Sequence, residues 1–568
     1  MSKLTVTDFF CGCGGFSEGF RQQGFDIING YDYWKPAINT YNHNFGISKG
    51  ILRNILDFEG PTELIDDLPD TDVILGSPPC VSFSSSNNSG KADKSLGVKL
   101  TEVFLRIVVV KKFQPNSKLK AWFMENVTNS TTYLAREYNF KDLGLSDWAK
   151  KHRLSPTKVA IRIEGNSIVI NSAEYGSPQI RKRVITGEII QRGGLIVPPK
   201  IHDETHNKFN NLSIIKSVLP KPNAKNFKKL IADPSYPNLT IKGSELTDYF
   251  YDTGLYECEW KNSKFLKCNH PYMGVMSFPE NEDKPSRTVT ATKIGTSREA
   301  LIYKSEYNRK GNGEFRTPTI REAACIMGFP ITYQFIGTEG IKWRLVGNAV
   351  CISVSRAFAR LVREELGLDT IDTPLIDTDL KLRSVPNLNT HMEKVFNNPP
   401  KRKIGSRFRR HPFKDGNLTV TLSNYDIVSD DKNTGKWQTS VQYGNGEGFP
   451  SNSYPDGFYQ EIEPIINKFE NGNQFLKIIN NGFSEKIASG GLLQNMYEEQ
   501  SDYLGLMEPT KLVEYLAELI NSWKYEIPNF EQTRNLIFKK GVVPKKQFFA
   551  LYAINKIATI ANSLSEKT

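Results

Sequence analysis

Cys80 stands where a cysteine could act as a nucleophile. It follows two prolines at the end of an apolar run, in TDVILGSPPCVSFS, and successive prolines stiffen the backbone and hold the next side chain in a fixed direction. A thiolate becomes reactive where a helix amino end or nearby cations stabilise its charge. A lone cysteine is more often a small buried apolar residue, but the rigid turn and the serine-rich segment after it favour a reactive thiol.

A carboxylate and two arginines could act together with such a thiol. Glu125 ends the apolar run KAWFMENV, where a carboxylate is rarely needed for packing and could exchange a proton with the edge of a base. Arg181 and Arg183 alternate in NSAEYGSPQIRKRVITG, so on an extended segment both project from one face. That face could hold a base and a phosphate. Taken alone, the two residues would be read as solvent-exposed surface arginines.

Two other motifs predict a site for a cofactor that carries a nucleoside. In DFFCGCGGFSEGF, a predicted strand leads into Gly12, Gly14 and Gly15, which permit a tight turn and the close approach of a ligand. Asp32 and Tyr33 end the next apolar run, DIINGYDY. The carboxylate could bind both hydroxyls of a ribose and the ring could stack on adenine. A glycine turn is a weak signal by itself, but the two motifs together indicate this kind of site.

The elements that would position these residues alternate between strands and helices. The β-rich runs LTVTDFF, DIINGYDY, TDVILGSPP and KAWFMENV are separated by stretches with helical spacing, FSEGFRQQ, WKPAINTYNHNF and LTEVFLRIVVVKKF. This alternation predicts βαβ units and a mostly parallel sheet with both faces covered. Ligands bind such sheets beyond the carboxyl ends of the strands, which is where the residues above fall. The predicted fold class is therefore α/β.

Composition limits the kind of protein and its partners. The chain has 568 residues, too many for one compact core, so two or three domains are expected. Its net charge of +11 suits a polyanion, although a merely soluble basic protein would fit as well. Seven scattered cysteines favour reduced thiols over disulfides. Without a secretory leader or an apolar run near the length of a membrane span, we expect a cytoplasmic protein with no membrane contact.

The motifs in their order resemble the motif series of the DNA cytosine-5 methyltransferases. DFFCGCGG, GSPPC, ENV, QIRKR, REAACIMGFP and VGNAV follow one another with plausible separations over about residues 4 to 365. The resemblance implies a Rossmann-like domain that uses S-adenosyl-L-methionine, interrupted by an irregular target-recognition domain. A C-terminal α+β extension follows, on which the resemblance has no bearing.

The resemblance also implies a mechanism. Cys80 would attack carbon 6 of a cytosine flipped out of double-stranded DNA, an extrusion that costs about a few kcal/mol. Glu125 would stabilise the ring at nitrogen 3, and Arg183 and Arg181 would hold the ring oxygen and the backbone phosphate. Carbon 5 would take the methyl group, after which loss of its proton and release of Cys80 complete a covalent catalysis.

The same resemblance assigns a cofactor site. The S-adenosyl-L-methionine site would comprise Phe10, Gly12, Gly14, Gly15, Asp32, Tyr33, Asn54, Ile55, Pro79, Leu100, Asn348 and Val350. Three residues depart from the family pattern. Val81 stands where Gln is common, Asn54 where Asp is usual, and Cys351 where Pro is common. These departures affect fine cofactor contacts and remove no catalytic group.

Five segments are predicted along the chain. Residues 1–189 and 306–368 would form the catalytic domain and 190–305, rich in loops, lysines and aromatic residues, the target-recognition domain. Residues 369–412 would be a linker with a basic run, and 413–568 a C-terminal extension without an assigned function. The basic run could lie along DNA phosphates or be a solvated linker face, and the DNA enzyme upstream favours phosphate contact.

The leading hypothesis is a bacterial-type methyltransferase that marks a short recognition sequence, with a companion restriction endonuclease; nothing indicates an oligomeric state. A fused nuclease would need carboxylates and a Lys on a short strand. QEIEPIINKFENGNQFLK has these residues but no clear strand arrangement, so this hypothesis is disfavoured. A regulator on an inactive scaffold is disfavoured by the intact motifs, and relatives that act on transfer RNA usually have a smaller recognition region. Cys258, Cys268 and His270 are three candidate zinc ligands without a CxxC, so ordinary core or surface residues are favoured.

Overall fold

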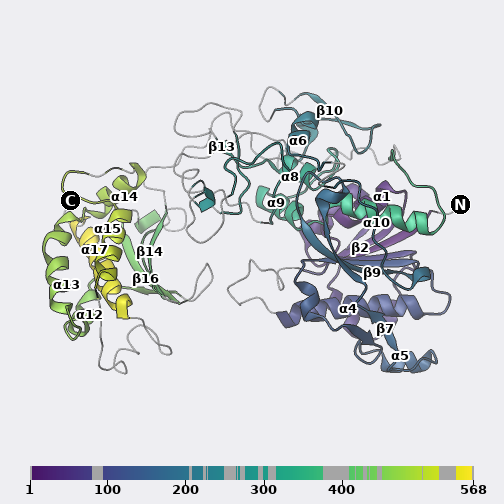
Figure 1. The fold of residues 1–568 in the computed structure, drawn as a ribbon, viewed down its shortest axis with the longest axis horizontal. Helices are drawn as coiled ribbons and strands as arrows, with labels where there is room; N and C mark the ends of the chain where they lie inside the picture. The colour runs from purple at the N-terminus through teal and green to yellow at the C-terminus, as the bar shows by residue number, and fades with distance from the viewer. Residues whose placement is uncertain are drawn as a thin grey trace. The chain divides into compact units, whose positions relative to one another are not determined.

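The computed structural model divides the chain into two units, Met1–Pro400 and Lys401–Thr568, which are described separately. It describes residues 3–79, 94–203, 208–221, 226, 228–248, 264, 266–268, 276–291, 298–304, 315–374, 376, 408–415, 418–425, 431–433, 435–443, 451–499, 501, 503–523 and 545–565. Figure 1 shows the elements of both units.

A seven-stranded sheet forms the centre of the first unit, with strand order β3-β2-β1-β4-β5-β9-β8. The strands are β1 (Thr5–Phe9), β2 (Asp26–Asp32), β3 (Gly50–Leu52), β4 (Val73–Gly76), β5 (Ala121–Asn126), β8 (Ser167–Asn171) and β9 (Lys182–Ile189). β1 to β5 are parallel, whereas β9 is antiparallel to both of its neighbours. The predicted α/β class with a mostly parallel sheet is confirmed.

Helices cover both faces of this sheet, as Figure 1 shows for α1, α10 and α4. Neighbouring residues of β5 show how the two faces are filled. Phe123 packs against Phe358 of α10 (Ile352–Glu365), with ring centroids 5.0 Å apart, while Trp122 packs against Phe104 of α4 (Lys94–Phe113) at 6.5 Å. Successive side chains of a strand point to opposite faces. Because helices cover both faces, neighbouring side chains such as Trp122 and Phe123 must both be apolar, which explains the continuous apolar run from which this strand was predicted.

Short elements make up much of the remaining first unit. They are α1 (Gly15–Gln22), α2 (Lys35–Phe45), α3 (Glu63–Asp66), β6 (Glu137–Asn139), α5 (Ser146–Lys151), β7 (Val159–Arg162), α6 (Ser213–Val218), β10 (Leu230–Ala232), β11 (Thr240–Lys242), β12 (Tyr303–Lys304), β13 (Phe315–Arg316), α8 (Ile320–Ile326) and α9 (Glu339–Asn348). The described part of residues 190–305 contains α6 and short strands. A separate recognition domain there stays a prediction.

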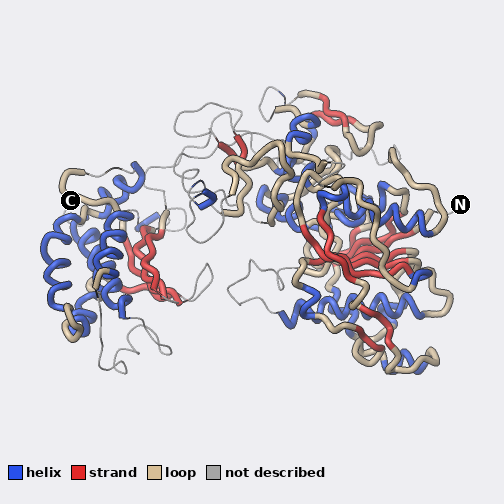
Figure 2. Tube along the Cα trace, viewed as in Figure 1, coloured by secondary structure: helices blue, strands red, loops and turns tan. Residues whose placement is uncertain are grey.

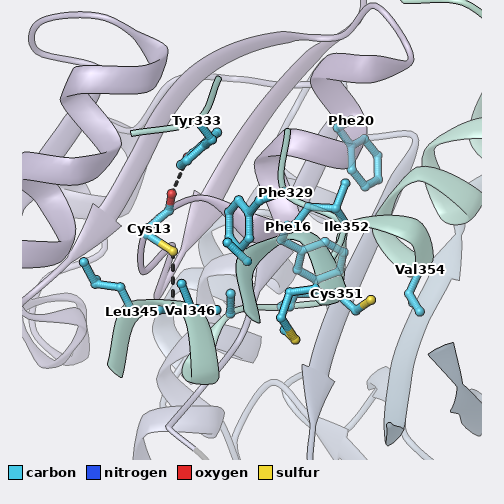
Figure 3. Close-up of a cluster of buried hydrophobic side chains, with 14 of the residues drawn as sticks. Cys13, Phe16, Phe20, Phe329, Tyr333, Leu345, Val346, Cys351, Ile352 and Val354 are labelled. Atoms are coloured by element: carbon cyan, nitrogen blue, oxygen red, sulfur yellow. Dashed lines mark hydrogen bonds between the residues drawn. The ribbon is translucent and has the colours of Figure 1, made fainter. Parts of the chain in front are cut away.

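The residues after α8 return to the start of the chain and pack on it. Figure 3 shows Cys13 and Phe16 among side chains that follow Met327 in the sequence. The Cys13 Sγ donates to Leu345 O at 3.4 Å, and the Tyr333 hydroxyl donates to Cys13 O. These contacts join the start of the first unit to the residues that follow α8, around the glycine turn.

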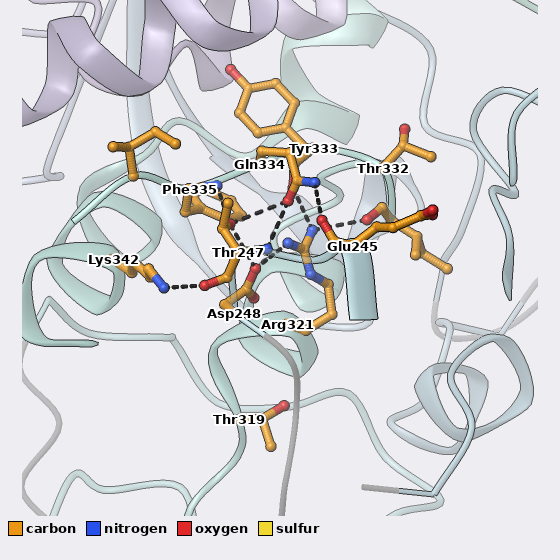
Figure 4. Close-up of polar contacts among 12 residues, drawn as sticks. Glu245, Thr247, Asp248, Thr319, Arg321, Thr332, Tyr333, Gln334, Phe335 and Lys342 are labelled. Atoms are coloured by element: carbon orange, nitrogen blue, oxygen red, sulfur yellow. Dashed lines mark hydrogen bonds and ion pairs between the residues drawn. The ribbon is translucent and has the colours of Figure 1, made fainter. Parts of the chain in front are cut away.

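Polar contacts hold residues 245–248 against residues 321–342 (Figure 4). Arg321 and Asp248 form an ion pair in which neither side chain is exposed. The Lys342 Nζ donates to Thr247 O, and the Thr247 backbone amide donates to the Gln334 side chain at 3.0 Å. Buried charges are tolerated only when they are paired or hydrogen-bonded, so these contacts fix the position of this segment.

The second unit is an antiparallel sheet with helices packed on one side (Figure 2). Its elements are β14 (Arg410–Asp415), β15 (Leu418–Asn424), β16 (Trp437–Tyr443), β17 (Ser451–Tyr454), α12 (Tyr459–Ile466), α13 (Gly472–Ile478), α14 (Gly490–Glu499), α15 (Pro509–Asn521) and α17 (Lys545–Ser565). Leu418, Val420 and Leu422 alternate along β15 and belong to the apolar core that α17 shares. The α+β character predicted for the extension is therefore present.

Two details of this unit bear on the hypotheses drawn from the sequence. The motif QEIEPIINKFENGNQFLK lies in α12 and α13. These residues therefore do not form the short strand that the nuclease hypothesis needs. β14 begins at Arg410, inside the predicted linker, and the Arg410 side chain donates to Gln442 at 2.8 Å. Residues 401–407 of the basic run lie outside the described residues.

None of the described helices is by itself long and apolar enough to span a membrane. Taken together, α9 and α10 are long and apolar enough for a membrane span by length and composition only, with an angle of 41° between the two helices.

Substitution of Gly15 tests the contact between the start of the first unit and the residues that follow α8. A Cβ atom at Gly15 would lie 2.4 Å from Val350 O, so we expect Gly15→Ala to destabilise the protein by about 1–3 kcal/mol, as overpacking does. The matched control is Gly340→Ala in α9, where a Cβ meets no atom within 4 Å and should stabilise the helix by about 0.5–1 kcal/mol. Calorimetry should show opposite shifts in the melting temperature, and equal shifts would contradict the contact.

Candidate active site

The predicted site residues gather at the carboxyl edge of the central sheet. The strand order reverses between β1 and β4, and ligands of open α/β sheets bind at such a reversal. The turns after β1, β2, β4 and β5 all lie at this edge because these strands are parallel. The antiparallel β9 begins at the same edge, since Asn126 at the end of β5 pairs with Val184.

Two adjoining cavities open at this edge, with volumes of about 270 and 150 Å³. Phe10, Asp32, Tyr33 and Pro79 line both cavities. The predicted cofactor residues that line one or both are Phe10, Gly12, Asp32, Tyr33, Asn54, Ile55, Pro79, Leu100, Asn348 and Val350. The structure thus brings together residues that are widely separated in the sequence.

Asp32 is held at the junction of the two cavities by backbone amides. Its carboxylate accepts hydrogen bonds from Gly12 N at 3.0 Å and from Trp34 N at 2.8 Å. Burial raises the pKa of Asp32, and hydrogen bonds from the backbone oppose that rise. The neighbouring Tyr33 ring is 64% exposed, so it borders the cavities with a face open to a flat ligand.

Gly14 and Gly15 do not line either cavity, and their predicted contact with the cofactor stays a prediction. A Cβ atom at Gly14 would lie 2.3 Å from the ring of Phe45, and one at Gly15 would lie 2.4 Å from Val350 O. These two glycines are needed for close packing behind the turn. At Gly12, by contrast, a Cβ would meet no atom within 4 Å, so that position faces open space.

Glu125 and Arg183 form an ion pair at the smaller cavity. The Arg183 Nε lies 3.1 Å from Glu125 Oε1, and Glu125 lines the cavity wall. Burial raises the pKa of Glu125, while the charges of Arg183 and then Arg181 act in the opposite direction. A carboxyl group with this environment can hold or release a proton beside a bound base.

Arg181 does not have the role that its spacing predicted. It is 3% exposed, and its guanidinium donates to the backbone carbonyls of Val289, Gly347 and Ala349 at 2.9–3.2 Å. The prediction that Arg181 holds a phosphate is therefore not supported, because these nitrogens fix backbone instead. The alternation rule gives the face of a strand but not the groups that cover it.

Cys80, the predicted nucleophile, and Val81 lie outside the described residues. The last described residue before them is Pro79, which borders both cavities. The Asn126 side chain donates to Pro78 O at 3.3 Å and so ties the end of β5 to the proline turn. The sequence motif ENV contained this residue, but only the Glu was assigned a role.

Other residues of the site carried no signal in the sequence. Arg344 lies over the ring of Trp34, with its guanidinium carbon 4.8 Å from the centroid, and both line the smaller cavity. Below the glycine turn, Asp8 is fully buried and accepts a hydrogen bond from Ser17 at 2.6 Å. Burial raises the pKa of Asp8 to about 7, which the Ser17 bond partly opposes.

Among the described residues, no group of three or more His, Cys, Asp or Glu side chains could hold a metal ion. Of the three candidate zinc ligands, Cys268 is described, whereas Cys258 and His270 lie outside the described residues.

Comparison with known proteins shows the family. A model of the C-5 cytosine-specific DNA methylases matches residues 4–364, which include the whole site above. The chain therefore belongs to the C-5 cytosine-specific DNA methylase family and is a DNA cytosine-5 methyltransferase. The residues after 364, including the second unit, lie beyond this match.

The similar proteins include type II methyltransferases and other methyltransferases. The type II methyltransferase M.HgiDI of Herpetosiphon aurantiacus is 27% identical over 366 residues, which cover 62% of this chain and 92% of that protein. M1.HphI of Haemophilus parahaemolyticus is 27% identical over 368 residues, covering 63% and 87%. Among solved structures, the Entamoeba histolytica methyltransferase EhMeth is 16% identical with a TM-score of 0.40, and the match covers 64% of this chain and 99% of that one.

Replacement of Asp8 tests its buried ionisation. The pKa of Asp8 is about 7 in the folded chain and has an ordinary value of 3.8, so its contribution to stability is complete below pH 3.8 and is lost as the pH rises to about 7. The free energy of unfolding should therefore fall less between pH 4 and pH 7 in Asp8→Asn than in the wild type. Urea denaturation across this range measures the difference, and parallel curves for the two proteins would contradict it.

Proposed function

We propose that the chain transfers a methyl group from S-adenosyl-L-methionine to carbon 5 of a cytosine flipped out of double-stranded DNA. The observation that carries the proposal is the pair of adjoining cavities. Asp32 and Tyr33 stand where the two meet, and the Glu125–Arg183 pair borders the smaller one. A nucleoside site thus directly adjoins a site for proton exchange with a base.

The residues present fit S-adenosyl-L-methionine. The larger cavity, bordered by Ile55 and Leu100, suits a purine, and the exposed ring of Tyr33 can stack on it. The Asp32 carboxylate is held by backbone amides and could accept hydrogen bonds from ribose hydroxyls, and the open space at Gly12 leaves room beside the turn. When bound, the cofactor supplies an electrophilic methyl group.

Three side chains would act on the cytosine. The Cys80 thiolate would form a bond to carbon 6, which makes carbon 5 nucleophilic. Glu125 would hold a proton at ring nitrogen 3, and its raised pKa favours the protonated form that can donate. Arg183 pairs with Glu125 and would orient that carboxyl while reaching the ring oxygen. Once carbon 5 carries the methyl group, its proton would be lost to solvent and Cys80 would leave as the thiolate, which restores the aromatic ring.

The biological setting is inferred from the relatives and from charge. Relatives named type II methyltransferases support a role in a restriction-modification system, in which the enzyme marks a short sequence and protects it from a companion endonuclease in the cytoplasm. The net charge of +11 supports a DNA partner, because each cation placed at a phosphate releases a condensed counterion.

Transfer of labelled methyl groups to random-sequence duplex DNA tests the reaction and its nucleophile. We expect 5-methylcytosine from the wild type, none from Cys80→Ala, and a rate lower by about 10²- to 10⁴-fold from Glu125→Gln, as for loss of a general acid. Cys268→Ala, a cysteine remote in sequence from the motifs, is the matched control and should retain activity. Label on cytosine in Cys80→Ala would rule out the covalent mechanism.

Cofactor affinity tests the role of Asp32 separately from catalysis. Asp32→Asn has one carboxamide oxygen in place of two carboxylate oxygens, so it cannot keep both backbone bonds and the ribose contact. We expect calorimetry to show S-adenosyl-L-homocysteine binding weakened by about 10- to 100-fold, the effect of losing hydrogen bonds to a charged group. Asp26→Asn, at the exposed start of the same strand, should bind like the wild type. Equal affinity of both variants would refute the assignment.

A further inference from the structure

Arg181 lies where separate parts of the catalytic unit meet. It directly precedes β9, the strand that carries Arg183. Its Nη1 atom donates to Val289 O at 2.9 Å, and its Nη2 atom donates to Gly347 O at 3.1 Å and to Ala349 O at 3.2 Å. One guanidinium therefore bonds to a segment that precedes α8 and also to the end of α9.

The first of these partners is the segment 286–291, which falls within the predicted target-recognition region. On one side, Ser286 exchanges two backbone hydrogen bonds, of 2.7 and 2.8 Å, with residues 178–180. On the other side, the indole nitrogen of Trp343 donates to Thr290 O at 3.0 Å. The segment is thus held between the residues that precede β9 and helix α9, and Arg181 spans the same gap.

The second partner is a wall of the cofactor cavity. Asn348, Ala349 and Val350 line the smaller cavity, and Asn348 stands between the two residues whose carbonyls Arg181 binds. A ligand that shifts Asn348 therefore shifts the carbonyls of Gly347 and Ala349 as well. Because the donors of a guanidinium have fixed spacing in one rigid plane, that shift is passed to the bond with Val289.

From this arrangement, which rests on the proposed function, we infer that Arg181 couples occupation of the cofactor cavity to the position of the 286–291 segment. Coupling between two sites is reciprocal, so DNA that positions this segment tightens cofactor binding by the same factor. Couplings of this kind typically change affinities by about 5- to 150-fold. Arg181 is then a positioning residue between two binding sites, whereas Arg183 serves the base itself.

Amide hydrogen exchange of the full chain, without and with S-adenosyl-L-homocysteine, tests the coupling without any catalysis. In the wild type we expect slower exchange in peptides that cover residues 347–350 and also in peptides that cover 286–291, which do not line the cavity. Arg181→Lys keeps a charge but has one donor nitrogen in place of the two that reach Val289 and the end of α9. In this variant the ligand should still protect 347–350 and should no longer protect 286–291. Arg183→Lys is the matched control and should keep both effects.

Three other outcomes of the exchange experiment would each contradict a different part of the inference. Protection of residues 347–350 alone in the wild type would refute the coupling and leave the proposed function intact. Protection of both segments in Arg181→Lys would show that Arg181 is not the connection. If S-adenosyl-L-homocysteine protects neither segment in the wild type, the proposed cofactor is wrong and the inference fails with it. Slow exchange of β1, β4 and β5 verifies that each variant is folded. If Arg181→Lys does not fold, the comparison of the wild type without and with S-adenosyl-L-homocysteine still tests the coupling.

Discussion

The close approach of Gly15 to the backbone of Val350 is the contact on which the smaller cavity depends. A side chain on Gly15 would collide with Val350 O, so this contact determines how near the return segment can come to the glycine turn. Gly12 on one side and Asn348 on the other can then border the same cavity. The apolar cluster around Cys13 and Phe16 supplies much of the buried area that holds this contact together (Figure 3).

The direction of β9 is a second constraint, and it decides the electrostatics of the site. Because β9 runs antiparallel to β5, its first residues meet the end of β5, and Arg183 lies beside Glu125. A parallel strand in the same place would begin at the opposite edge. Burial favours the protonated form of Glu125 and the nearby guanidinium favours the ionised form. A carboxyl group under these opposing effects is suited to proton exchange with a bound base.

Much of this arrangement could be predicted because a parallel sheet relates sequence directly to space. Polar residues that end apolar runs must meet at one edge, which placed Asp32 and Glu125 correctly, and the strand limits agree with the apolar runs to within a few residues. Long-range contacts gave no such signal. The spacing of Arg181 could not reveal that carbonyls of Val289 and Gly347 surround it. Nor could the glycine motif separate Gly12, which faces open space, from its packed neighbours.

The contacts that attach residues 233–248 to the catalytic core explain how an irregular segment can be held in one orientation. Apolar contacts are non-directional, whereas Tyr236 donates to Glu18 at 2.6 Å and Thr332 donates twice to Asp233, at 2.9 and 2.6 Å. The buried pair of Arg321 and Asp248 adds a further directional contact (Figure 4). A buried ion pair contributes little net stability but costs several kcal/mol, about 3–5, when one partner is removed. Displacement of this segment would separate such pairs. The directional contacts therefore restrict its position more than apolar burial alone would.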